Sequence, residues 1–189
     1  MGNDISAIKE LAKKQGVPHC GKDGKTGETL VKTALVPMFK YRHLRIDGWY
    51  GSNILGNLDG RILQHPDNKQ SKLITKTSVV PKMLGYEPHL GSRIDYFPPL
   101  SDHKVAWDFI SFRGFLDHRM NMQFTWQGCD SVLAAPLVID LVRFMELAKR
   151  QGMSGLIDEL AVYFKDPLDA GVYDLWSQYA LFNEWVEKM

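Results

Sequence analysis

Apolar and polar side chains alternate without a break in the stretch Met120-Asn121-Met122-Gln123-Phe124-Thr125-Trp126-Gln127. A period of two is typical of a strand with one packed face and one wet face. The same period runs through Val105, Trp107 and Phe109, and residues 93–97 read as another strand. With Asp117-His118 as a turn, these stretches predict an antiparallel ribbon.

Helical spacing surrounds this ribbon. It predicts helices near residues 4–15, 27–41, 69–84, 130–149, 154–164 and 170–186, and a strand over 43–52. Strands grouped between helical blocks predict an α+β fold, a mainly antiparallel sheet with helices on one face. The pattern changes near residues 28 and 129, which predicts three segments: 1–28, an inserted sheet domain over 29–128, and 129–189. The two outer segments are expected to belong together.

The bulk composition sets limits on function. The 189 residues are 44% hydrophobic, enough for one ordinary core, and 23 basic and 22 acidic residues leave a net charge of +1. A near-neutral chain has no general field for nucleic acid or an anionic membrane, so we expect neither as a partner. The two cysteines suggest no disulfide framework, and no apolar run reaches about 18 residues, so we expect a cytoplasmic protein.

Lys72 and Lys76 lie one helical turn apart in the predicted helix over 69–84. Like charges at this spacing repel by roughly 0.2–0.5 kcal/mol, so the pair is either a solvated basic face or a site bridged by an anion. Just upstream, Asn53, Asn57 and Asp59 occupy a predicted loop. They are either ordinary turn residues or groups that hold a polyhydroxy ligand. A phosphorylated sugar would satisfy both the lysines and the loop.

Other polar residues have structural interpretations beside functional ones. Asp130 precedes an apolar helix, where an N-cap is expected, and Lys165 follows a predicted helix end, where a cation suits the dipole. Asp102 and Lys104 resemble surface turn residues, and Asp23 lies in a glycine-rich loop. The six histidines lack metal-ligand spacing, which argues against a zinc site, and the sequence contains no G-x-G-x-x-G motif.

Six blocks taken together resemble the inositol-phosphate synthase family in order and spacing. They are Asp23-x-Lys25-Thr26-Gly27-Glu28-Thr29, Asn53-x-Leu55-Gly56-Asn57-x-Asp59-Gly60, Ser71-Lys72-x3-Lys76, Asp102-x-Lys104-x-Ala106-x-Asp108, Asp130-Ser131-x-Leu133-Ala134-x-Pro136-Leu137-x-Ile139-Asp140, and Phe164-Lys165-x-Pro167. The resemblance covers essentially this whole chain but only about the C-terminal half of the family.

The resemblance implies a specific chemistry. Family members convert D-glucose 6-phosphate to myo-inositol 1(3)-phosphate through NAD-dependent oxidation, enolisation, aldol cyclisation and reduction. It implies catalytic roles for four lysines that hold phosphate and the reacting oxygens: Lys72, Lys76, Lys104 and Lys165. It also implies substrate-binding positions, namely Asn53, Leu55, Asn57, Asp59, Thr26 and Gly27. Three carboxylates would orient the lysines or contact the cofactor, namely Asp23, Asp102 and Asp130.

The resemblance further implies a homo-oligomer, a tetramer joined through the sheet domain, and leaves open a divalent or monovalent cation. The chain departs from many members at Asp95-Tyr96, Ile54 and Leu58, which bears on the product. The glycine-rich NAD loop of the family is absent from the sequence, so the NAD site is incomplete and we expect the isolated chain to be inactive. Two alternatives stay open: a non-catalytic oligomerisation module derived from the family, or a related sugar-phosphate cyclase.

Overall fold

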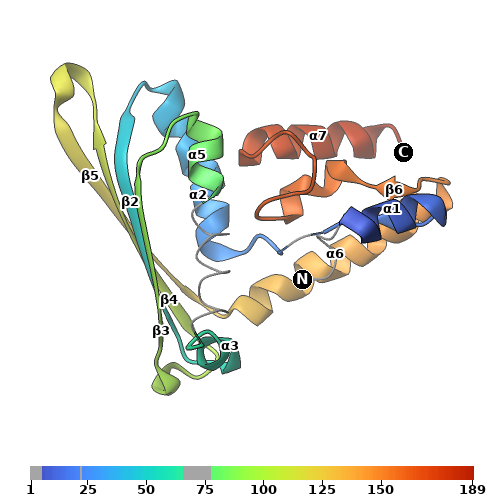
Figure 1. The fold of residues 1–189 in the computed structure, drawn as a ribbon, viewed down its shortest axis with the longest axis horizontal. Coiled ribbons are helices and arrows are strands. Elements are labelled where there is room, and N and C mark those ends of the chain that lie inside the picture. Colours follow the sequence, from blue (N-terminus) through green and yellow to red (C-terminus); the bar gives the residue numbers. More distant parts are fainter. Residues whose placement is uncertain (1–5, 22, 66–77) are drawn as a thin grey trace. The chain divides into compact units, whose positions relative to one another are not determined.

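The computed structural model describes residues 6–21, 23–65 and 78–189 (Figure 1). The chain divides into two compact units. The terminal unit combines Met1–Thr26 with Ala134–Met189, and the sheet unit comprises Gly27–Leu133. The sequence placed the corresponding changes after residues 28 and 128. That the terminal unit belongs to a nucleotide-binding domain stays a prediction.

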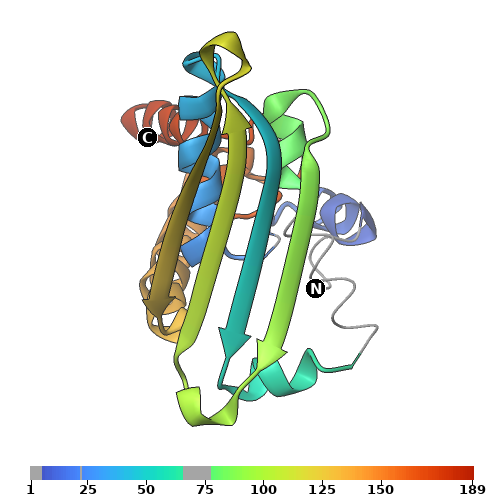
Figure 2. The same ribbon diagram turned by 90° about the vertical axis from the view of Figure 1, so that its left-hand side faces the viewer.

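The sheet unit is built on four strands in the order β3-β2-β4-β5 (Figure 2). These are β2 (Arg45–Leu55), β3 (His89–Tyr96), β4 (Lys104–Arg113) and β5 (Arg119–Gly128). β4 pairs antiparallel with both β2 and β5, whereas β2 and β3 run parallel. The expected ribbon of β4 and β5 is therefore present, but β3 joins by a parallel edge pairing. A long connection from β2 to β3 permits this, because parallel neighbours need a crossover rather than a tight turn.

Helices α2 (Gly27–Tyr41) and α5 (Val79–Leu84) cover one face of this sheet (Figure 1). Short segments α3 (Leu58–Ile62), η2 (Pro98–Leu100) and η3 (Phe115–Asp117) connect the strands. The covered face is apolar over much of its length. Its buried residues include Val36 and Phe39 from α2 and Ile46, Ile110 and Phe112 from the strands. Phe39 meets Phe112 edge-on with ring centroids 4.8 Å apart, a favourable aromatic geometry.

The predicted loop over residues 53–60 is only partly a loop. Asn53 and Leu55 lie in strand β2, and α3 begins at Leu58. Asn57 caps α3, because its side-chain oxygen accepts a hydrogen bond from the Gly60 backbone N–H at 3.2 Å. The expectation of a single loop was therefore wrong for Asn53 and Leu55, since strand pairing with β4 continues through both residues.

The terminal unit contains four helical segments and a two-stranded sheet among its described residues. They are α1 (Ser6–Lys14), β1 (Pro18–His19), most of α6 (Asp130–Arg150), β6 (Gly155–Leu156), η4 (Asp158–Tyr163) and α7 (Leu175–Glu187). Its core gathers Ala148, Ile157, Leu160, Phe164 and Trp185.

A continuous helix over residues 154–164 was predicted, and the structure replaces it with β6 and η4. Gly155 has a φ of +80°, outside the helical region. The backbone N–H groups of Gly155 and Ile157 donate to Val17 and His19 carbonyls at 3.0 and 2.8 Å. Pairing with β1 therefore takes the hydrogen bonds that a helix would have used.

The predicted helix that carries Lys72 and Lys76 lies outside the described residues except for α5. Among the residues that the structure describes, no helix combines the length and apolar character needed to cross a membrane.

Candidate active site

One end of the sheet brings together several residues singled out from the sequence. Leu55, the last residue of β2, pairs with Lys104, the first residue of β4, and Lys104 pairs with Gly128 at the end of β5. Three strand ends therefore meet in one row. Because polar groups at strand ends are held by a rigid sheet, this row is a suitable base for a binding site.

The Lys104 ammonium is held by Asp130 at this end of the sheet. Its Nζ donates to both Asp130 carboxylate oxygens, at 2.9 and 3.2 Å. The Lys104 side chain is only 12% exposed, whereas the Asp130 side chain is 37% exposed. Asp130 is the first residue of α6, where the positive end of the helix dipole favours a carboxylate. The pair is thus fixed in direction and still reachable by a ligand.

Gly27 lies beside this pair at the start of α2. Its φ is +48°, a conformation that favours glycine. A Cβ atom added there would lie 3.8 Å from the Trp126 Nε1 and 3.9 Å from an Asp130 oxygen. The structure therefore places Gly27, Lys104 and Asp130 close together within the sheet unit.

Three other residues predicted from the sequence lie near the same strand ends. Asn57 and Asp59 belong to the cap and first turn of α3, with Asp59 exposed. Asp102 is exposed in the turn before β4. Its charge lies close enough to Cys129 to act on the pKa of that thiol. A hydrogen bond with Ser131 lowers the pKa of the Cys129 thiol, and the Asp102 charge acts in the other direction. Asp102 thus lies close to the start of α6.

A buried polar cluster lies between α2 and the sheet, and we call it the inner cluster. Its members are each at most 4% exposed: Glu28, Lys32, Trp49, Asn53 and Asp108. Lys32 Nζ donates to Glu28 at 2.6 Å, and Asn53 Nδ2 donates to the other Glu28 oxygen at 2.8 Å. Trp49 Nε1 donates to Asp108 at 2.6 Å, and Lys32 Nζ lies 3.8 Å from that same oxygen.

Gly51 makes room for the inner cluster in the middle of β2. A Cβ atom there would lie 2.9 Å from a Glu28 oxygen and 3.1 Å from an Asp108 oxygen. The absence of a side chain lets both carboxylates approach the same point of the sheet. The close approach of two acids is balanced by Lys32, whose ammonium also lies 5.7 Å from the centre of the Trp49 ring.

The terminal unit holds a second lysine–carboxylate pair, Lys165 with Asp23. Lys165 Nζ donates to the Asp23 side chain at 3.2 Å, and the Lys165 backbone N–H donates to the Asp23 carbonyl at 2.9 Å. Gly24 and Phe164 form an antiparallel bridge between them. Two residues that are far apart in sequence are therefore tied by backbone and side chain. Thr26, half-buried, ends the same segment.

Lys25 is an unexpected buried cation of the terminal unit. Its backbone N–H donates to the Tyr163 carbonyl at 2.7 Å, and its ammonium donates to the side-chain oxygen of Gln178 on α7. Burial lowers the pKa of Lys25 to about 8, and attraction to Asp174 opposes that shift. Gln178 is itself fully buried. The segment that carries Asp23 is therefore held on both sides.

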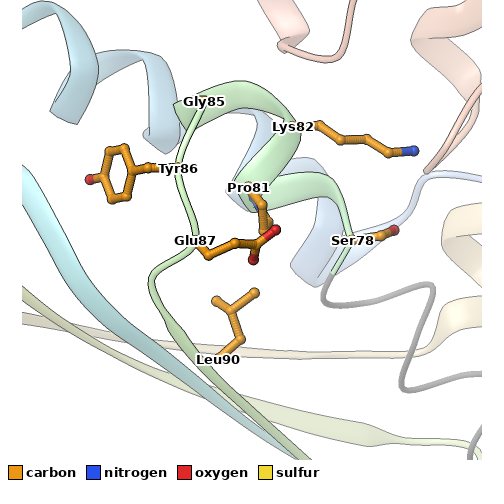
Figure 3. Close-up of a pocket in the computed structure, with 7 residues that line it drawn as sticks. All are labelled: Ser78, Pro81, Lys82, Gly85, Tyr86, Glu87 and Leu90. Atoms are coloured by element: carbon orange, nitrogen blue, oxygen red, sulfur yellow. The ribbon is translucent and has the colours of Figure 1, made fainter.

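The sheet unit also has a pocket of about 550 Å³ beside α5 (Figure 3). Lys82 and Tyr86 extend from it in opposite directions. Within the described part of the chain, no residue predicted from the sequence is among those that line this pocket, which are Ser78, Pro81, Lys82, Gly85, Tyr86, Glu87 and Leu90. The described walls of the pocket therefore share no residue with the strand-end site.

Sequence reasoning overlooked Lys25, Gln178 and most of the inner cluster. A signal was present for three members: Glu28 and Lys32 have helical i, i+4 spacing, and Asp108 keeps the strand phase of buried Ala106 and Ile110. A charged residue at a strand position whose side chain points toward the core indicates a buried polar contact. Lys25 offered no comparable signal, because the loop around it has no period.

The described residues match the pattern of an NAD-binding site poorly. A dinucleotide site needs a parallel sheet with a glycine-rich turn at a helix N-terminus. The terminal unit has one two-stranded parallel pairing, β1 with β6, and the sequence contains no G-x-G-x-x-G motif. The described residues therefore do not form a dinucleotide site by themselves, and no redox step is assigned to them.

Fold and side chains together define an α+β protein in which Lys32, Lys104 and Lys165 are each oriented by a carboxylate, an arrangement suited to an anionic ligand. The family model for myo-inositol-1-phosphate synthase matches residues 27–131. The chain belongs to this family.

Relatives and solved structures agree with that assignment. The chain is 40% identical to inositol-3-phosphate synthase 1 of Bacteroides thetaiotaomicron, an alignment covering 96% of this chain and 44% of the relative. It is 34% identical to inositol-3-phosphate synthase 1 of Rattus norvegicus, covering 87% of this chain and 33% of the relative. The chain therefore spans less than half the length of these relatives.

Among solved structures, inositol-3-phosphate synthase of Caenorhabditis elegans superposes with a TM-score of 0.87 at 27% identity, covering 96% of this chain and 40% of that one. A myo-inositol-1-phosphate synthase-related protein of Thermotoga maritima gives 0.86 at 28% identity, covering 97% and 49%. Both similarities extend over both units of this chain.

Proposed function

We propose that this chain supplies the phosphate- and oxyanion-binding part of an inositol-phosphate synthase that converts D-glucose 6-phosphate to myo-inositol 1(3)-phosphate. The observation that carries the proposal is the Lys104–Asp130 pair, placed beside Gly27 and Leu55 where three strands end. An ammonium with a fixed direction in a mostly buried position stabilises negative charge on oxygen far better than a solvated one.

In this proposal the four lysines hold the phosphate and the reacting oxygens of the ligand. Lys104 and Lys165 each face a carboxylate, and Lys72 and Lys76 are assigned the same class of role by family resemblance. Ring closure places negative charge on ketone, enolate and alkoxide oxygens in turn, and ammonium groups stabilise each of them. Asn53, Asn57 and Asp59 are proposed to bind the sugar hydroxyls. Oxidation and reduction by NAD are proposed to need residues beyond these 189, so the isolated chain is expected to be inactive.

Calorimetric titration of this chain with glucose 6-phosphate tests the proposal. We expect saturable binding, and we expect Lys104→Ala to weaken it about 10- to 100-fold, since a charge-assisted hydrogen bond contributes roughly 1.5–3 kcal/mol. Lys149→Ala, at an exposed position of α6, is the matched control and should bind like the wild type. Equal binding by both variants would show that Lys104 is only a structural lysine.

A second candidate function is an assembly module that joins copies of the chain through the sheet. The specific observation is an aromatic group on the sheet face opposite α2. Tyr50 and Trp107 are 40% and 36% exposed there, with ring centroids 6.2 Å apart. Phe109 continues the group beside Trp107. A homo-oligomer, with the tetramer as the family expectation, would cover these rings. Turnover of glucose 6-phosphate by the chain with added NAD would contradict a purely structural role.

A further inference from the structure

The inner cluster joins two elements of the proposed site through one carboxylate. Glu28 directly follows Gly27 at the start of α2, and it accepts the hydrogen bond of Asn53 from strand β2. Both Glu28 and Asn53 are almost fully buried, at 2% and 0% exposed. The Glu28 side chain therefore links the beginning of the helix to the strand that leads into the predicted substrate-binding residues.

Stability alone is a weak reason for three charges at this position. Replacing a buried ion pair by apolar residues of similar volume is often neutral or stabilising. The cluster also requires Gly51, because a side chain there would collide with Glu28 and Asp108. We therefore look for the role of these buried charges in the orientation that they impose on an adjacent side chain.

The chemistry of Glu28 dictates how the Asn53 carboxamide is turned. Lys32 Nζ donates to Glu28 at 2.6 Å, an ion pair in which the Glu28 carboxylate is the acceptor. An ionised carboxylate only accepts hydrogen bonds, so Asn53 must direct its Nδ2 toward Glu28 and its Oδ1 away from it. That Oδ1 is buried and has no hydrogen-bond partner among the residues that the structure describes. A buried acceptor without a donor is costly, and the cost is recovered when a ligand supplies an O–H group.

We propose that Glu28, held by Lys32, is a positioning residue that turns the Asn53 carboxamide so that Oδ1 accepts a hydroxyl of the sugar phosphate. The inference rests on the proposed function, which has Asn53 bind a sugar hydroxyl, and deepens it by assigning the orientation of the Asn53 carboxamide to Glu28. A site built to accept one O–H rejects the analogue that lacks it, because the acceptor is then left unsatisfied.

Binding of glucose 6-phosphate and its monodeoxy analogues tests this inference. We expect the wild-type chain to bind one analogue at least 10-fold more weakly than the parent sugar. Glu28→Gln should reduce that difference to under 3-fold, because a glutamine can donate to Asn53 and let the carboxamide turn over. Glu87→Gln, an exposed acid of the same unit, should keep the wild-type difference. An unchanged difference in Glu28→Gln would overturn the inference while leaving the proposed function intact.

Nuclear magnetic resonance of the wild type provides a test that needs no folded Glu28 variant. The Asn53 side-chain NH₂ signal, identified by its loss in Asn53→Asp, should be protected from exchange with water and should shift when glucose 6-phosphate is added. A signal that stays fixed while the sugar phosphate saturates the chain would overturn the inference. Failure of the wild type to bind the sugar phosphate at all would instead overturn the proposed function and the inference with it.

Discussion

At the scale of single residues, Lys25 shows how a buried charge makes stability depend on pH. Its ammonium faces the uncharged amide of Gln178, and burial lowers its pKa from 10.5 to about 8. The unfolded chain therefore keeps this proton up to a higher pH than the folded chain does. Where the unfolded state binds more protons, stability rises with pH, so we expect a rise between about pH 8 and 10.5.

Urea unfolding at pH 7 and pH 10 measures this contribution. We expect Lys25 to add roughly 2 kcal/mol to the free energy of unfolding at pH 10 relative to pH 7, from the linkage of a single group. Lys25→Met keeps the length of the side chain and should remove that increment. Lys149→Met at an exposed site should keep it. An identical pH dependence in Lys25→Met and the wild type would show that Lys25 titrates normally.

At the scale of elements, the strand ends depend on a close backbone contact at Gly56. A Cβ atom at Gly56 would lie 2.4 Å from both the N and O atoms of Ser101. Backbone atoms cannot rotate aside as a side chain can. This contact joins the end of β2 to the turn before β4, and so it sets the position of Leu55 beside Lys104.

Gly56→Ala tests the importance of this contact. We expect the substitution to lower the free energy of unfolding by about 1–3 kcal/mol, as overpacking of a close-packed site does, and to weaken binding of glucose 6-phosphate. Gly128→Ala is the control, since its Cβ would meet its neighbours at 3.5 Å or more. Chemical denaturation provides the comparison. Equal stability of the two variants would mean that the end of β2 can move away from Ser101 without loss of stability.

Element prediction from sequence succeeded where the hydrophobic period is long and regular. The alternation in residues 120–127 gave strand β5, and the helix predicted over 130–149 is α6. The prediction of one continuous helix over 154–164 was wrong, because pairing with β1 makes residues 155 and 156 a strand and leaves only the 3-10 helix η4 after them. Asn53 was read as a loop residue because asparagine favours turns, whereas strand pairing with Ala106 decides its conformation.

At the scale of the whole molecule, the exposed aromatic face of the sheet unit bears on assembly. Trp107 and Tyr50 lie on the face opposite α2, and a stable interface typically buries about 800 Å² on each partner. We expect the chain to be oligomeric at micromolar concentration. Trp107→Glu should shift it toward monomer in light scattering coupled to size-exclusion chromatography, because a charge opposes burial of that face.

Tyr41→Glu is the control for this prediction. Tyr41 is 69% exposed at the end of α2 and lies away from the aromatic group of the sheet. This variant should keep the mass of the wild type. A wild-type chain that is monomeric at the same concentration would contradict assembly through the sheet.

The sequence by itself determined the α+β class, the alternating strands and the family, because hydrophobic period and motif spacing are properties of neighbouring residues. It also identified Lys104, Asp130, Asp23 and Lys165 as candidates, without showing which of them pair. Only the tertiary structure decided that Lys104 is held by Asp130, Lys165 by Asp23, and Asn53 by Glu28. Hydrogen bonds between residues 25 to 142 positions apart depend on how strands and helices pack, and no local pattern encodes that packing.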